Sequence, residues 1–139
     1  MSWVVDTCVI IDIYCGDPVF AEPSALLLDQ KREDGLVIAP ISYVELAPSF
    51  KGDCEAQDEF LGDLGISVNF ENKRDVVLAA HKAWYDHISR KRDGKDVRRP
   101  IADALIGAYA LSCGGLITRN DADFSALYAG LKIINPMTV

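Results

Sequence analysis

The sequence predicts a three-layer α/β/α domain with a mostly parallel central sheet. Short apolar runs of strand length alternate along the chain with longer segments whose apolar residues recur every three or four positions. Strands that alternate with helices favour parallel pairing, with helices covering both faces of the sheet. At 139 residues the chain has the usual size of one domain, and no repeat or linker divides it, so we expect a single domain over residues 1–139.

The first half of the chain contains three expected strands, at residues 2–5, 36–39 and 66–70. The first is followed by a helical turn at 7–14 that the Asp17-Pro18 pair ends, and by a helix at 23–33 with Pro23 in its first turn. After the second strand we expect Ser42 to cap a short helix that contains Glu45. A further helix at 55–64, closed by Gly65, leads into the third strand.

In the second half, Asn72 is expected to cap a long helix whose apolar residues, from Val76 to Ile88, are spaced by three and four. An apolar helix at 101–113 follows and ends at Gly114-Gly115. The last expected elements are strands at 116–118 and 131–134, on either side of a short helix at 125–128.

Acidic residues stand next to several of these strands, just beyond them or at the start of an apolar helix. They are Asp6, Glu45, Asp103, Asp121 and Asp123. Residues beyond the carboxyl ends of parallel strands gather at one edge of the sheet, so acids far apart in the sequence would meet there. Carboxylates that close repel each other unless they share protons or bind a cation. A cluster of oxygen ligands without histidine is typical of a Mg²⁺ or Mn²⁺ site.

Each acid also has a simpler interpretation. Asp6 could cap the helix after it, Glu45 could be an exposed helical acid, and Asp121 and Asp123 could be ordinary turn residues. Asp103 is harder to explain in this way, because it lies between Ala102 and Ala104 in an apolar helix, where carboxylates are rare unless they are paired or bind metal. Asp12, on the first helix, is expected to face solvent or the rim of the site.

The net charge of −7 argues against a nucleic-acid partner, but the charge is unevenly distributed. Residues 90–99 hold six basic residues and two acids, which leaves −11 for the rest of the chain. The six basic residues are Arg90, Lys91, Arg92, Lys95, Arg98 and Arg99. This segment is either a solvated loop or an arm that contacts RNA phosphates, and the two interpretations are compatible.

No apolar run approaches the length of a membrane span, and the N-terminus lacks the pattern of a signal peptide, so we expect a cytoplasmic protein without a membrane partner. The four cysteines show no zinc-type spacing. Cys8 and Cys113 lie in apolar stretches and are expected to be reduced core residues.

Four segments, taken in order, resemble the motifs of PIN-domain ribonucleases. They are Val4 to Asp12, Ser42 to Leu46, Arg99 to Ala108, and Ile117 to Phe124. The resemblance runs from residue 3 to about residue 136, and the small size most resembles VapC-type toxins of toxin–antitoxin pairs. It implies a PIN-like fold and an endoribonuclease that cleaves single-stranded or loop RNA with Mg²⁺ or Mn²⁺.

The resemblance also assigns roles to residues. Asp6 and Asp103 would be the principal metal ligands, while Glu45 and either Asp121 or Asp123 would bind a second ion or its waters. Thr7, Thr118 and Asn120 would surround and orient these carboxylates. The expected partners are an RNA substrate, a cognate antitoxin whose tail enters the acidic groove, and a second copy in a homodimer. Apolar residues suited to an antitoxin groove, and equally to a core, are Ile13, Tyr14, Tyr43, Leu46 and Phe50.

The sequence departs from the family pattern at two positions. Cys8 stands where the family usually has a polar residue, and Asn120 where many members have an acid, which leaves the choice between Asp121 and Asp123 open. Two other functions remain: an inactive PIN-fold module that binds RNA or protein, and a housekeeping RNA-processing nuclease. A haloacid-dehalogenase-like phosphatase would need an acid at position 8, and a dinucleotide-binding or P-loop fold would need a glycine-rich first turn.

Overall fold

A parallel sheet lies at the centre of the computed structural model, which describes residues 1–90 and 101–139. Within those residues the sheet has five strands in the order β3-β2-β1-β4-β5, and each adjacent pair is parallel. Val4 at the centre of β1 pairs with Val37 of β2 on one side and with Leu116 of β4 on the other. The strand bounds are β1 Trp3–Val5, β2 Leu36–Ile38, β3 Ile66–Val68, β4 Gly115–Ile117 and β5 Ile133–Ile134.

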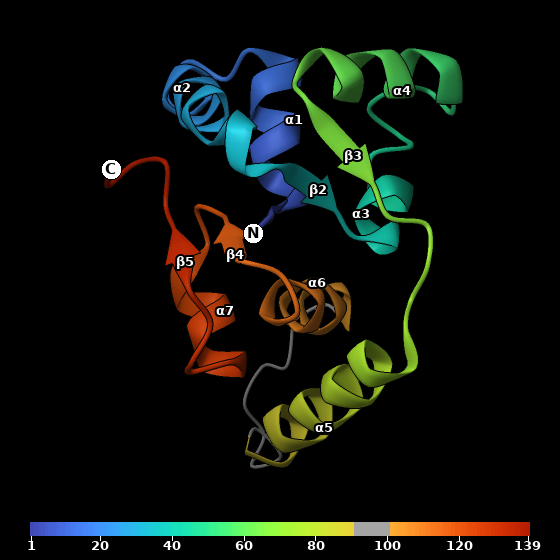
Figure 1. Ribbon diagram of the computed structural model, residues 1–139, viewed down its shortest axis with the longest axis vertical. Helices are drawn as coiled ribbons and strands as arrows, with labels where there is room; N and C mark the ends of the chain where they lie inside the picture. The colour runs from blue at the N-terminus through green and yellow to red at the C-terminus, as the bar shows by residue number, and fades with distance from the viewer. Residues whose placement is uncertain (91–100) are drawn as a thin grey trace.

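Helices cover both faces of this sheet (Figure 1). The helices α1, α2 and α4 lie on one side, and α5, α6 and α7 lie on the other. Their bounds are α1 Thr7–Cys15, α2 Ala21–Lys31, α3 Pro40–Glu45, α4 Cys54–Asp63, α5 Arg74–Arg90, α6 Ile101–Leu111 and α7 Asp121–Leu127, with a 3₁₀ turn η1 at Arg32–Asp34.

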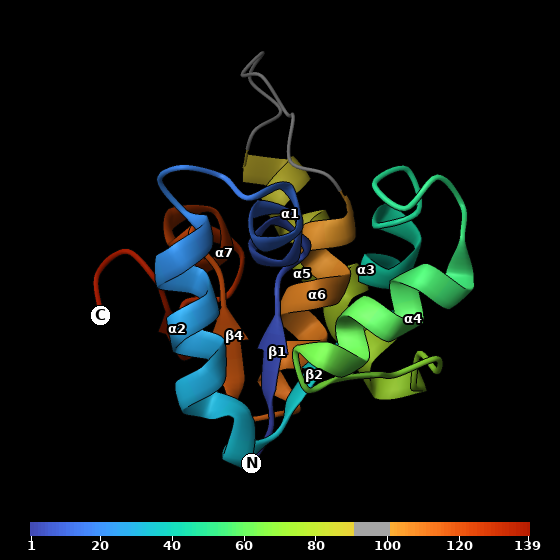
Figure 2. The same cartoon turned by 90° about the horizontal axis from the view of Figure 1, so that it is seen from above.

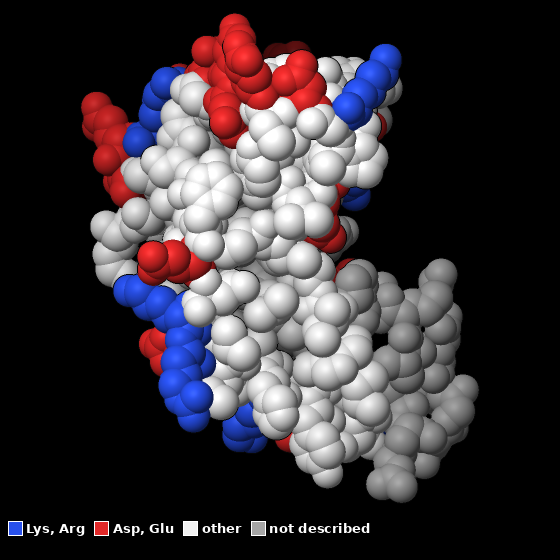
Figure 3. All heavy atoms as spheres, turned by 90° about the vertical axis from the view of Figure 1, so that its right-hand side faces the viewer, with Lys and Arg blue, Asp and Glu red and all other residues white. Residues whose placement is uncertain are grey.

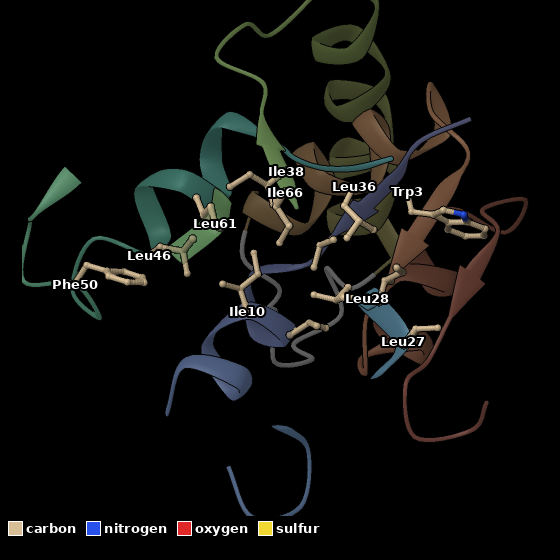
Figure 4. Packing of buried hydrophobic residues seen from close by; sticks show 13 residues of the cluster. Trp3, Ile10, Leu27, Leu28, Leu36, Ile38, Leu46, Phe50, Leu61 and Ile66 are labelled. Carbon is tan, nitrogen blue, oxygen red and sulfur yellow. The ribbon is translucent and has the colours of Figure 1, made fainter. Parts of the chain in front are cut away.

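Alternate side chains of β1 build two separate cores, because successive strand residues point to opposite faces. Trp3 and Val5 pack with the apolar residues of α1 and α2, such as Ile10 and Leu28 (Figure 4). Val4 faces the other way and packs with α5, α6 and α7. Two buried layers of helix contacts around one sheet confirm the predicted three-layer α/β/α fold.

Helices α3 and α7 begin clearly earlier than the sequence indicated. Pro40, not a residue after Ser42, opens α3, so the predicted cap at Ser42 is wrong: its side chain is fully buried inside the helix. Proline suits the first turn of a helix, where its missing N–H costs nothing. In the same way α7 begins at Asp121 rather than at residue 125. Asp121 and Asp123 therefore belong to the first helical turn and not to a loop.

The surface carries its acids unevenly. Helix α4 and its preceding residue expose five carboxylates, and Figure 3 shows acidic side chains gathered at the end of the molecule that holds α4. These residues are Asp53, Glu55, Asp58, Glu59 and Asp63. Among the described residues, no helix combines the length and apolar character needed to cross a membrane.

Candidate metal-binding and active site

The candidate site lies where the strand order changes direction. From β1 the chain moves to β2 and β3 on one side, and then returns to β4 and β5 on the other. Such a switch point leaves a crevice beyond the carboxyl ends of the two strands that flank it. In Figure 2, β1 runs towards α1, and α3 and the start of α6 lie at the same edge. Asp6 follows β1, Glu45 ends α3, Asp103 lies in the first turn of α6, and Thr118 follows β4.

Asp6 is held by side chains from both sides of this crevice. It is the N-cap residue of α1, but its side chain makes no capping hydrogen bond, so the capping interpretation is wrong. Instead Thr118 Oγ1 donates to Asp6 Oδ2 at 2.7 Å, and Cys8 Sγ donates to the same oxygen at 3.2 Å. Both contacts fall on Oδ2, so neither side chain occupies Oδ1.

Asn120 hydrogen-bonds to both of these donors, Thr118 and Cys8. Its backbone N–H donates to Thr118 Oγ1 at 3.0 Å, and its side-chain Nδ2 donates to Cys8 Sγ at 3.6 Å. The four residues therefore form a closed ring of hydrogen bonds around one carboxylate oxygen. Cys8 is half-buried, its thiol is free, and it packs against the core as its apolar neighbours suggested, but it also lines the site.

Burial raises the pKa of Asp6, and the hydrogen bonds from Thr118 and Cys8 only partly oppose this shift. Asp6 is 5% exposed. Burial likewise raises the pKa of the Cys8 thiol to about 12, and the negative charge of Asp6 acts in the same direction. A carboxylate in such surroundings favours a nearby cation, because a positive charge offsets the cost of its desolvation.

Glu45 approaches the site from α3. Thr7 Oγ1 donates to its Oε1 at 2.6 Å, so the residue after Asp6 fixes the second acid. Asp103, in the first turn of α6, is half-buried. An open pocket of about 370 Å³ brings the three acids together, and it is lined by Asp6, Thr7, Cys8, Ile11, Glu45, Asp103 and Asn120.

The two acids of the closing segment stand apart from this lining. Asp121 is exposed and accepts a hydrogen bond from the N–H of the next residue, Ala122, at 3.0 Å. Asp123 is half-buried in the first turn of α7. Asn120, which precedes both, is the residue of this segment that lines the pocket.

The pocket's ligand set suits a hard cation that retains water. Within the described residues, no three His, Cys, Asp or Glu side chains are grouped closely enough to hold a metal by themselves. Magnesium usually binds through one or two carboxylates and keeps several waters, and so it does not need a full protein cage. The buried Asp6, with Asp103 and Glu45 on the same pocket, fits that requirement.

Arg119 and Asp12 form an ion pair beside the site, which was not predicted from the sequence. Arg119 Nε donates to Asp12 Oδ2 at 2.6 Å and Arg119 Nη2 to Asp12 Oδ1 at 3.3 Å, which joins α1 to the segment after β4. Asp12 is 6% exposed, so of the two expected positions, facing solvent or at the rim of the site, the first is wrong. The sequence carried one signal for the pair, since Arg119 lies between the site residues Thr118 and Asn120.

Of the six basic residues expected to contact RNA, the structure describes one. Arg90 ends α5, is exposed, and donates from Nη2 to the backbone oxygen of Ala126 in α7 at 3.2 Å. Lys91, Arg92, Lys95, Arg98 and Arg99 lie outside the described residues.

Comparison with known families identifies the fold. The family model described as PIN domain matches residues 3–130. The chain belongs to the PIN domain family. A search of curated proteins found no match.

Solved structures with the same fold cover almost the whole PIN domain chain. A chain of VapBC2 from Rickettsia felis, in a structure bound to a promoter DNA fragment, aligns with a TM-score of 0.73 and 15% identity over 97% of this chain and 98% of its own. A chain of VapBC-1 from nontypeable Haemophilus influenzae aligns with a TM-score of 0.70 and 21% identity, over 99% of this chain and 100% of its own. A chain of a toxin–antitoxin complex from Klebsiella pneumoniae aligns with a TM-score of 0.59 and 17% identity, over 99% of both chains.

Proposed function

We propose that this PIN domain is a Mg²⁺- or Mn²⁺-dependent endoribonuclease and the toxin of a VapBC-type pair. The observation that carries the proposal is the convergence of Asp6, Glu45 and Asp103 on one pocket at the switch point of the sheet. The second support is membership of the PIN domain family, together with structural likeness to chains of toxin–antitoxin complexes.

In this proposal, Asp6 and Asp103 hold the metal, with Glu45 on a second ion or on metal-bound water. A divalent ion bound there supplies an activated water at neutral pH and neutralises charge on the phosphodiester. The chain's own contribution is orientation. Thr118 and Cys8 fix one oxygen of Asp6, and Thr7 fixes one oxygen of Glu45, so the carboxylates need little rearrangement to bind a cation.

The fourth acid is proposed to be Asp123 rather than Asp121. Asp121 is exposed, whereas Asp123 is half-buried, and a partly buried carboxylate favours a nearby cation. The arm formed by Arg90 and the basic residues after it is proposed to contact RNA phosphates, which an otherwise acidic chain needs in order to hold a polyanion.

An antitoxin and a second copy of this chain are the proposed protein partners. Of the five apolar residues considered for an antitoxin groove, Leu46 and Phe50 are buried in the core. Tyr14 is 44% exposed and its ring packs on Phe50 at 4.2 Å between ring centroids. Tyr14 is therefore the member of this set best placed to meet an antitoxin.

Cleavage of labelled single-stranded and stem-loop RNAs tests the enzymatic proposal. We expect cutting with Mg²⁺ or Mn²⁺, none with a chelator, products with 5′-phosphate and 3′-hydroxyl ends, and loss of cutting in Asp6→Asn. Asp29→Asn, an exposed acid near the end of α2, is the matched control and should cut like the parent. Folded parent protein that binds these RNAs but cuts none with either metal would instead favour an inactive RNA-binding module.

A further inference from the structure

Arg119 occupies an unusual position for a basic side chain in this acidic protein. It lies between Thr118, which donates to Asp6, and Asn120, which lines the pocket. Its guanidinium is close enough for its charge to act on the Asp6 carboxylate and the Cys8 thiol. A cation at this place is at the rim of the proposed active site.

The guanidinium is also held in one orientation. Asp12 accepts two of its N–H groups, and the ring of Phe20 lies 4.4 Å from its central carbon. An arginine has five N–H donors in a rigid plane, so three remain outside this ion pair. A side chain that is already fixed loses little conformational entropy when it binds a ligand.

The ion pair presents its positive end outwards. The Asp12 side chain is 7% exposed, whereas that of Arg119 is 32% exposed. The carboxylate therefore lies behind the guanidinium as seen from solvent. Phosphate is a natural ligand for this arrangement, because a planar guanidinium can donate two parallel hydrogen bonds to it.

We propose that Arg119 is a substrate-contacting residue whose guanidinium binds a phosphate of the RNA strand beside the bond that is cleaved. This inference rests on the proposed function and adds to it a specific contact, independent of the basic arm at 90–99. Asp12 and Phe20 act as positioning residues that hold Arg119 in place.

The salt dependence of RNA binding tests the contact. Fluorescence anisotropy with a labelled single-stranded RNA, in a chelator so that no cleavage occurs, gives the dissociation constant at several KCl concentrations. Each phosphate contact on a single strand contributes about 0.7 to the slope of log K against log salt. A purely structural role for Arg119 would not change that slope.

Two double variants remove the arginine without leaving a buried carboxylate unpaired and without changing the net charge. They are Asp12→Asn/Arg119→Gln and Asp12→Leu/Arg119→Met, the second replacing the ion pair by apolar groups, which folded proteins often tolerate. We expect weaker binding and a slope reduced by about 0.7 in both. Arg119→Lys should keep the slope. Arg32→Gln, an exposed arginine before β2 at the opposite edge of the sheet, is the matched control and should bind like the parent.

The possible failures are distinct. A parent that binds and cuts RNA, with both folded double variants keeping its slope, overturns the role of Arg119 and leaves the proposed function intact. A parent that neither binds nor cuts RNA overturns the proposed function and this inference with it.

Discussion

Thr7 Oγ1 donates a hydrogen bond of 2.6 Å to Glu45 Oε1, which ties the residue after Asp6 to the acid on α3. The two residues are 38 positions apart in the sequence. Because Thr7 immediately follows Asp6, this bond fixes the distance between the turn after β1 and the second acid. The site therefore depends on hydroxyl groups as well as on carboxylates.

Removing that hydroxyl should weaken metal binding. Thr7→Val keeps the shape of the side chain but leaves Glu45 without this donor, and partners of this kind commonly change metal affinity on the order of 10-fold. Thr7→Ser retains a hydroxyl and should bind metal like the parent. Titration calorimetry with Mn²⁺ measures the difference, and equal affinities for the valine and serine variants would contradict this role of Thr7.

Thr118→Val should reduce the stability of the fold. Thr118 is fully buried and donates to the buried Asp6, so its replacement removes a hydrogen bond to a carboxylate and costs about 2 kcal/mol of unfolding free energy. Urea denaturation measures this cost. The matched control is Thr138→Val near the exposed C-terminus, where the hydroxyl bonds only to the backbone oxygen of Asn135 at 3.3 Å. A loss for Thr118→Val no larger than for the control would rule out the proposed contribution.

Gly107→Ala should destabilise the packing of α6 on α7. A Cβ at Gly107 would lie 2.4 Å from Cε2 of Tyr128, whose hydroxyl donates to the backbone oxygen of Ala104. The ring cannot withdraw without losing that bond, and overpacking of this kind costs about 1–3 kcal/mol. In Gly62→Ala on α4 the new Cβ meets nothing within 4 Å, so better helix propensity should raise stability by up to about 1 kcal/mol. The thermal unfolding midpoint should fall in Gly107→Ala and rise in Gly62→Ala. A midpoint of Gly107→Ala equal to that of the parent would contradict the expected clash with Tyr128.

Arg119→Met should cost more stability than its partial exposure suggests. It leaves the carboxylate of Asp12 buried without its ion-pair partner, and we expect a loss of about 2 kcal/mol, reduced from the value for fully buried pairs because Arg119 is one-third exposed. Adding Asp12→Leu should restore most of that loss. Urea denaturation of the single and double variants completes a mutant cycle, in which simple additivity of the two changes would contradict the coupling.

Much of the fold followed from local patterns in the sequence. The strands at 2–5, 36–39 and 116–118 were predictable because each is a short apolar run with a clear boundary: Asp6 follows the first, Pro40 follows the second, and Gly114-Gly115 precedes the third. Helix starts were less predictable. Pro40 opens α3 two residues before the expected cap, because proline suits the first turn of a helix. Helix α7 extends back to Asp121, where two acids in its first turn favour the helix N-terminus.

The site was predictable only in part for a similar reason. Asp6 follows β1, Glu45 ends the short helix after β2, and Asp103 lies in the first turn of α6, so topology brings them to one edge. The contacts among Asp6, Cys8 and Thr118 depend on side-chain directions across more than 100 residues. The buried Asp12–Arg119 pair depends on the same long-range geometry, which no local pattern reports.

The role of Asp103 as a metal ligand in RNA cleavage is measured by the cleavage rate of Asp103→Asn under single-turnover conditions, with Mn²⁺ in excess. Asparagine keeps the size of Asp103 but removes the charge that the proposed metal site requires. We expect the rate to fall on the order of 100-fold or more, with unchanged thermal stability and with Asp29→Asn cutting at the parent rate. Cleavage by folded Asp103→Asn at the parent rate would contradict that role.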